Sequence, residues 1–71
     1  MAGLARLTER ERQVVAFLAL GRSTKEIAYV LGISDSTTRV LLGRAAARLG
    51  VRSRDELVRV ATREALPGLV K

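Results

Sequence analysis

The sequence predicts an all-α fold, a bundle of four short helices in one domain that spans residues 1–71, with its core in 7–65. A Ser or Thr followed three residues later by Glu occurs at three places, and this spacing lets both side chains bond the free amides of a helix start. A glycine stands where each of the first three helices has to end. No stretch alternates apolar and polar residues over the length of a useful strand.

The first two helices are predicted near 9–20 and 24–31. Their capping boxes and stops are, in chain order, Thr8 with Glu11, Gly21, Ser23 with Glu26, and Gly32. Leu7 precedes the first cap in the position of a hydrophobic staple. Apolar residues at helical spacing form the inward sides, namely Val14, Phe17 and Leu18 in the first helix and Ile27, Ala28 and Leu31 in the second.

The third helix is predicted near 35–49, after the break at Gly32 and Ile33. Either Ser34 or Asp35 could cap this helix, so the capping residue stays open at this point. Gly50 supplies the stop. The inward stripe recurs at positions i, i+4, i+7 and i+11, which are Thr38, Leu42, Ala45 and Leu49.

The fourth helix is predicted near 54–65, from a box at Ser53 and Glu56 to a stop at Pro67-Gly68. Its apolar arc is wider than a terminal helix needs in order to cover a small core, and comprises Leu57, Val58, Val60, Ala61 and Ala65. A domain of this size buries only about 60% of its unfolded surface and is marginally stable alone. We therefore expect a homodimer whose interface consists of Leu57, Val58, Ala61 and Ala65.

Composition excludes several classes of chemistry. The chain has no His and no Cys, which removes His- or Cys-based zinc sites, Ser-His-Asp and Cys-His nucleophile systems, and thiol redox chemistry. Three of the seven carboxylates are explained as helix caps, and no Gly-rich phosphate loop occurs. We therefore expect no catalytic residue, no metal, no cofactor and no enzyme activity.

Apolar runs are short throughout the chain. The longest, Val14 to Leu20, falls far below the roughly 20 residues that a membrane span requires. No signal-peptide pattern opens the sequence. The expected location is therefore cytoplasmic, with no membrane contact.

Positive charge is concentrated in one part of the chain. The 13 Lys and Arg residues against 7 Asp and Glu give a net charge of +6. No acidic residue lies between Asp35 and Asp55, whereas five arginines do, at positions 39, 44, 48, 52 and 54. A local basic patch is typical of binding to phosphate backbones. A solvated arginine-rich face would explain the same composition.

The helix arrangement favours phosphate-backbone binding over a solvated arginine-rich face. A short helix, the break from Leu31 to Ser34, and a longer helix form a helix-turn-helix arrangement. In such a pair the first helix rests across the DNA backbone and the second enters the major groove. Many helical corners of this kind bind nothing, so the arrangement alone is a weak indication.

Specific residues strengthen the helix-turn-helix interpretation. The sequence resembles the LuxR-type (FixJ/NarL/GerE-like) DNA-binding domain from about Leu7 to Ala61. The residues that carry the resemblance are Leu7-Thr8-Glu9-Arg10-Glu11, Gly21, Thr24-Lys25-Glu26-Ile27-Ala28, Leu31, Ile33-Ser34, Thr37 and Arg48-Leu49-Gly50-Val51.

This resemblance implies a four-helix domain of a transcriptional regulator, whose third helix, 35–49, enters the major groove of double-stranded DNA as part of a dimer. Dimers of this family usually form through the fourth helix, on two-fold-symmetric sites. Carried over by position, the DNA-binding residues are Thr24 and Lys25 at phosphates, Ser36 and Thr37 at the groove entrance, Arg39, Val40, Gly43 and Arg44 at the bases, and Arg48 in the basic position before Leu49-Gly50. In that family Glu11 completes a cap and Arg10 pairs locally.

The third helix departs from the family pattern of Thr-Val-Lys-x-His. Here the stretch is Thr37-Thr38-Arg39-Val40-Leu41, so a hydroxyl enters the inward stripe and the histidine is lost. The Thr38 hydroxyl is placed to bond a carbonyl of the preceding turn. Gly43 weakens the helix by roughly 1 kcal/mol relative to Ala.

A second function therefore stays open. Opposite the inward stripe the third helix carries small or apolar residues, Ser36, Val40, Gly43 and Ala47, which could pack on protein instead of DNA. In that case the domain is an interaction module for a regulator, a sigma factor or an RNA polymerase subunit. A DNA-binding domain of the sigma-factor type would also fit the helix-turn-helix. The sequence Leu49-Gly50-Val51 at the end of the third helix favours the LuxR-type interpretation.

Overall fold

The computed structural model describes the backbone of residues 3–65 and the side chains of residues 5–63. In chain order its helices are the 3-10 helix η1 (Gly3–Arg6), α1 (Glu9–Ala19), α2 (Thr24–Leu31), α3 (Asp35–Leu49) and α4 (Arg54–Ala65). This part of the chain holds no strand, so the predicted all-α class is confirmed. The first helix ends one residue earlier than predicted, and η1 was not predicted. The predicted stop at Pro67-Gly68 lies outside the described residues.

Two capping boxes form as predicted. At α1 the amide of Glu11 donates to Thr8 Oγ1 over 3.2 Å, and the amide of Thr8 donates to Glu11 Oε1 over 3.0 Å. Ser23 and Glu26 form the same reciprocal pair at α2. At α4 only half of the box forms, because the carboxylate of Glu56 accepts from the amide of Arg52 instead of from the cap.

The turn of the helix-turn-helix is defined by a cap and a glycine. Ser34, not Asp35, caps α3, since its Oγ accepts from the amide of Thr37 over 2.9 Å. Gly32 has a φ of 69° and ends α2 in the left-handed conformation. This conformation lets the amide of Ile33 bond the carbonyl of Ala28 over 3.0 Å, which closes the end of α2 and starts the chain toward α3.

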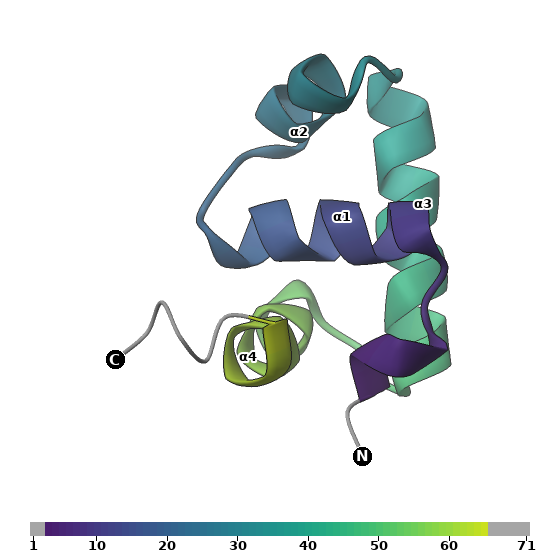
Figure 1. Ribbon diagram of the computed structural model, residues 1–71, viewed down its shortest axis with the longest axis vertical. Coiled ribbons are helices and arrows are strands. Elements are labelled where there is room, and N and C mark those ends of the chain that lie inside the picture. Colours follow the sequence, from purple (N-terminus) through teal and green to yellow (C-terminus); the bar gives the residue numbers. More distant parts are fainter. Residues whose placement is uncertain (1–2, 66–71) are drawn as a thin grey trace.

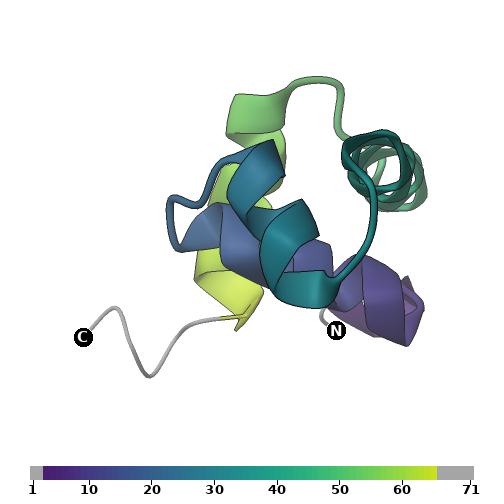
Figure 2. The same ribbon diagram turned by 90° about the horizontal axis from the view of Figure 1, so that it is seen from above.

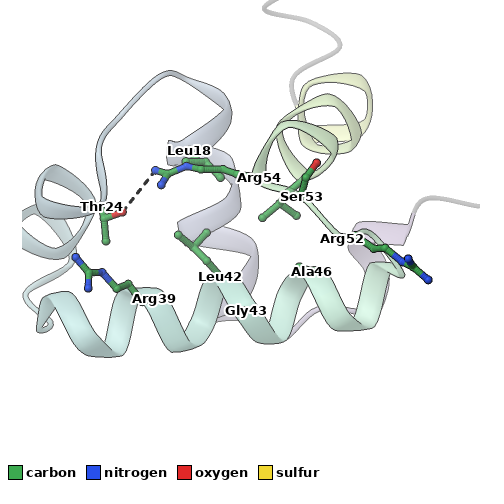
Figure 3. Close-up of a pocket in the computed structure, with 10 residues that line it drawn as sticks. Leu18, Thr24, Arg39, Leu42, Gly43, Ala46, Arg52, Ser53 and Arg54 are labelled. Carbon is green, nitrogen blue, oxygen red and sulfur yellow. Dashed lines mark hydrogen bonds between the residues drawn. The ribbon is translucent and has the colours of Figure 1, made fainter.

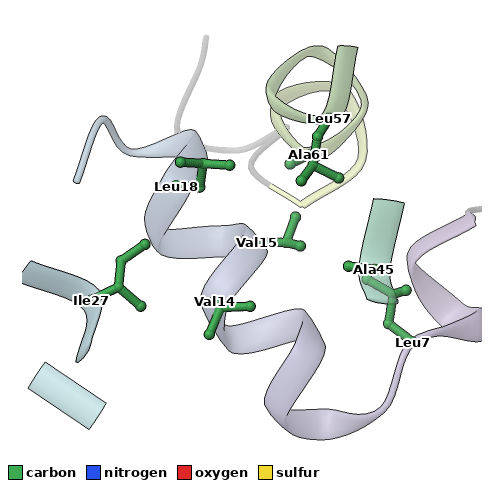
Figure 4. Close-up of a cluster of buried hydrophobic side chains, with 8 residues drawn as sticks. All are labelled: Leu7, Val14, Val15, Leu18, Ile27, Ala45, Leu57 and Ala61. Atoms are coloured by element: carbon green, nitrogen blue, oxygen red, sulfur yellow. The ribbon is translucent and has the colours of Figure 1, made fainter. Parts of the chain in front are cut away.

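Helix α1 is the centre of the core. It lies between α2 and α4, while α3 runs along one edge of the molecule (Figures 1 and 2). The buried cluster contains Leu7, Val14, Val15, Leu18, Ile27, Ala45, Leu57 and Ala61 (Figure 4). Val15 was not among the predicted core residues, and Phe17, which was, is only half-buried. A helix covered on several sides buries a wider arc than one amphipathic stripe, which explains the burial of Val15, whereas Phe17 borders a hollow at the surface.

Helix α3 packs through small residues. Thr38 and Ala45 are fully buried, whereas Leu42 and Leu49 are half-buried. As predicted, Thr38 Oγ1 donates to the carbonyl of Ser34, over 3.0 Å, so its buried hydroxyl has a partner. Because only one narrow side of α3 is buried, most of this helix faces outward. None of the helices in the described part is long and apolar enough to cross a membrane.

Candidate nucleic-acid interface

The outward face of α3 is small and nearly apolar. Ser36, Val40, Gly43 and Ala47 are all exposed, and Val40 keeps 50% of its surface accessible. Arg39 and Arg44 lie on the two flanks of this face and are exposed as well. The face predicted to read DNA is therefore presented to solvent.

Arg39 is held only loosely. Its Nη2 lies 3.9 Å from Oδ2 of Asp35, one helical turn earlier, and 73% of its side chain is exposed. A long ion pair at the surface, with one partner exposed, contributes about 0–1 kcal/mol. Arg39 can therefore exchange Asp35 for a phosphate or a base at little cost.

A groove runs beside α3 on the Arg39 side. It has a volume of about 470 Å³ and lies between α3, the start of α2 and the start of α4 (Figure 3). Its lining residues are Leu18, Thr24, Arg39, Leu42, Gly43, Ala46, Arg52, Ser53, Arg54 and Leu57. Among the described residues that line the groove, none is acidic. The groove thus combines an apolar floor with three arginines.

Arg52 and Arg54 were not among the predicted site residues. The structure brings Arg54 to the predicted phosphate contact Thr24, thirty positions earlier in the sequence, where its Nη2 donates to Oγ1 over 3.5 Å (Figure 3). The acid-free run of five arginines contained both residues, so a signal for them was present. That run did not show which arginines the fold gathers beside α3.

The remaining predicted contacts at the start of α2 and α3 lie on the surface. Lys25 is exposed and lines a second hollow with Tyr29. Ser36 is exposed, and Thr37 is exposed with its hydroxyl oxygen accepting from Ser34 over 2.9 Å. Ser36 and Thr37 thus lie in the first turn of α3, and Thr24 lies beside this helix as a lining residue of the groove.

Arg48 has a partner inside the protein. Its Nε lies 3.0 Å from Oε1 and 3.3 Å from Oε2 of Glu11, a carboxylate that is only 2% exposed. The Arg48 side chain remains 49% exposed. Arg48 therefore ties the last turn of α3 to the first turn of α1. Arg10 pairs locally, donating to Gln13 over 2.9 Å, as the resemblance implies.

The pKa of Glu11 lies below its ordinary value of 4.5. The largest cause is the hydrogen bond from the backbone amide of Thr8, and the positive charge of Arg48 acts in the same direction. Burial of the carboxylate works against both. The ionised form is thus favoured in the folded protein.

The residues predicted for a dimer interface separate into two groups. Leu57 and Ala61 are buried in the protomer's own core and present no surface to a second copy. Val58 is half-buried and borders a hollow between the end of α1 and the start of α4. The side chain of Ala65 lies outside the described residues.

The short helix α2, the Gly32 turn and the longer helix α3 together define a helix-turn-helix domain. The sequence matches the family described as bacterial regulatory proteins, luxR family, over residues 5–61. The chain belongs to this family, and the resemblance seen in its motifs is confirmed. No solved structure gives a significant match.

Curated relatives agree with this assignment. The chain is similar to the spore germination protein GerE of Bacillus subtilis, with 44% identity over 52 residues that cover 73% of the chain and 70% of GerE. It is 43% identical over 58 residues to the transcriptional regulatory protein FixJ of Azorhizobium caulinodans, covering 82% of the chain and 28% of FixJ. It is 50% identical over 48 residues to the nitrate/nitrite response regulator protein NarP of Escherichia coli, covering 68% of the chain and 22% of NarP. The chain thus spans about a quarter of the length of FixJ and NarP.

The Glu11–Arg48 pair predicts an acid-sensitive component of stability. Because the pKa of Glu11 is lower in the folded state, this component is complete above pH 4.5 and is lost as the pH falls through the folded value. Glu11→Gln should lower the free energy of unfolding at neutral pH and flatten its dependence on pH in the acid range. Urea unfolding at a series of pH values measures both effects.

Glu26→Gln is the matched control, since Glu26 also closes a capping box but is exposed. It should change the acid dependence much less than Glu11→Gln. An acid limb in Glu11→Gln as steep as that of the wild type would contradict this account.

Proposed function

We propose that this chain is the DNA-binding part of a transcriptional regulator and inserts α3 into the major groove of duplex DNA as a dimer. The observation that carries the proposal is the outward face of α3, a small surface flanked by Arg39 and Arg44 and bordered by a groove without acidic residues. Membership of the luxR family supports it, as does the similarity to FixJ, a transcriptional regulatory protein, and to NarP, a response regulator. The role is one of binding, in the cytoplasm, without catalysis or a cofactor.

Base recognition in this proposal depends on arginine. The chain contains no Asn, and its only Gln is Gln13 on α1, so the amide side chains that usually read adenine are absent from α3. Arg39 and Arg44 can each make paired hydrogen bonds to guanine, and Val40 can contact a thymine methyl. Affinity then comes mainly from phosphate contacts and specificity from few base contacts.

Gly43 fits a close approach of α3 to DNA. It lies in the interior of the helix, and a Cβ added there would meet nothing within 4 Å. Packing within the protein therefore gives no reason for a glycine that weakens the helix by roughly 1 kcal/mol. Contact with an outside partner does give one, because a missing side chain lets the backbone come nearer.

Dimerisation would use the side of α4 that carries Val58. Val58 is the member of the predicted interface whose side chain is both described and accessible. Two protomers related by a two-fold axis would then place two α3 helices on half-sites one turn of DNA apart. Contact of the bound dimer with RNA polymerase or another regulator is a further part of the proposal.

A titration with duplex DNA tests the central claim. Arg39→Gln and Arg44→Gln should each weaken binding by about 1–3 kcal/mol and relax the preference at one base pair. Fluorescence anisotropy with duplexes selected from a random pool measures the affinity, and repeating the selection measures the preference. Arg59→Gln, an exposed arginine on α4, is the charge-matched control.

Absence of duplex binding by the wild type, even at low salt, would contradict the proposal. The interaction-module alternative would then be favoured. It predicts that Val40→Glu or Leu41→Glu impairs binding to a protein partner while the arginine variants do not.

Gly43→Ala separates stability from binding. Because the added methyl group meets open space and Ala favours helix, the free energy of unfolding should rise by about 1 kcal/mol. DNA affinity should fall, since the methyl group occupies the surface that approaches the duplex. Ala47→Gly, on the same face, is the reciprocal control and should lower stability without this loss of affinity. Equal DNA affinity in Gly43→Ala and the wild type would show that the glycine serves no close contact.

Val58→Asp tests the dimer. A carboxylate at this position should produce monomers by analytical ultracentrifugation and weaken DNA binding, because the two half-sites would be bound independently. Val60→Asp is the control, since Val60 is also half-buried on α4 but lines a different hollow. Identical sedimentation of Val58→Asp and the wild type, free and on DNA, would rule out this interface.

A further inference from the structure

We propose that the groove beside α3 is the binding site for one sugar-phosphate strand of the DNA duplex, and that Arg52 and Arg54 contact the phosphates of this strand. The inference rests on the proposed function and extends it beyond the helix-turn-helix. Arg52 lies in the connection after α3 and Arg54 is the first residue of α4. Neither position belongs to the two helices that normally touch DNA in such a pair.

The chemistry of the groove matches a nucleic-acid strand. Three arginines from three different segments, Arg39, Arg52 and Arg54, are among its lining residues (Figure 3). Its floor is apolar and consists of Leu18, Leu42, Ala46 and Leu57, with Gly43 leaving open space at the edge. A DNA strand alternates charged phosphates with largely apolar sugars, so both kinds of lining residue find a complement. One guanidinium group can also donate two parallel hydrogen bonds to the oxygens of one phosphate.

The position of the groove relative to α3 supports a DNA strand over an acidic peptide. At about 100° per residue, Arg39 and Ala46 fall on one flank of the outward face and Arg44 falls on the other. A helix in the major groove lies between the two phosphate strands of the duplex. One strand would therefore run past the Arg39 flank, which is where the groove and its two further arginines lie.

The charges of Arg52 and Arg54 are available for this role. Among residues 5–63 the ion pairs involve neither of them. Arg54 is oriented by Thr24, a neutral acceptor, so its charge is not cancelled by that contact. The same contact places Thr24, a predicted phosphate ligand on α2, next to an arginine from α4. Two segments thirty residues apart thus converge on one position along the strand.

Salt dependence of binding provides the test. Loss of one phosphate contact reduces the slope of log affinity against log salt by about 1, so Arg52→Gln and Arg54→Gln should each show this reduction and the double variant about twice as much. Each should also weaken binding at low salt by about tenfold, uniformly across sequences. Arg59→Gln removes the same charge from another side of α4 and should leave the slope nearly unchanged.

A conservative variant and a modified duplex exclude indirect effects. Arg54→Lys keeps the charge and should retain most of the slope, which a merely structural role would not predict. Duplexes can be made in which a neutral methylphosphonate replaces one phosphate at a time. Wild-type affinity should fall when the replaced phosphate is one that lies over the groove. Arg54→Gln should show no further loss at its own phosphate, because the contact is already missing.

The outcomes separate this inference from the function on which it rests. If the wild type binds duplex and both Arg52→Gln and Arg54→Gln retain its affinity and its salt dependence, the strand-binding role of the groove is overturned while the DNA-binding function stands. If the wild type binds no duplex, both are overturned. Binding of an acidic peptide that requires Arg52 and Arg54, while the Arg52→Gln/Arg54→Gln double variant binds duplex as the wild type does, would assign the groove to a protein partner and also overturn the inference.

Discussion

The orientation of α3 depends on one buried carboxylate. Glu11 accepts from the amide of Thr8, which completes the cap of α1, and it also accepts from the guanidinium of Arg48 in the last turn of α3. A charge removed from water is stable only when its hydrogen bonds are satisfied, so α1 and α3 are held in the one geometry that provides them. In a domain with a small apolar core, this polar contact defines an angle that packing of Val and Ala leaves loosely determined.

The other end of α3 is fixed by local geometry, and the two constraints together leave its outer side free. The left-handed Gly32 and the Ser34 cap set where α3 begins, and the buried Thr38 turns its hydroxyl inward to the backbone. Only small residues are fully buried on α3, so it packs close to α1 along a narrow strip. Its remaining circumference carries arginines and small residues, and this exposed face is thus a consequence of how little of α3 the core requires.

Local features of this fold are predictable from sequence, and distant contacts are not. Caps and left-handed glycines act over three or four residues, which explains why the bounds of α2, α3 and α4 agree with the prediction and α1 differs by one residue. The Glu11–Arg48 pair spans 37 positions and the Thr24–Arg54 contact spans 30, and neither leaves a periodic signal. The sequence therefore shows neither that Arg48 has a partner inside the protein nor that Arg54 lies beside Thr24. Leu57 and Ala61 were assigned to an interface for the same reason, because an apolar arc does not show which part of it faces the protein's own core.

The sparse reading face makes symmetry part of recognition in the proposed complex. With Arg39 and Arg44 as its base-reading polar residues, one protomer distinguishes few base pairs, and each pair contributes about 1–3 kcal/mol of discrimination. Phosphate contacts along the groove add affinity without information about sequence. A dimer doubles the base contacts and adds the distance between half-sites as a further criterion that no single protomer can measure. Selectivity would then depend on α4 as well as on α3, since α4 sets the spacing of the two reading helices and its first residue, Arg54, fixes the strand beside each of them.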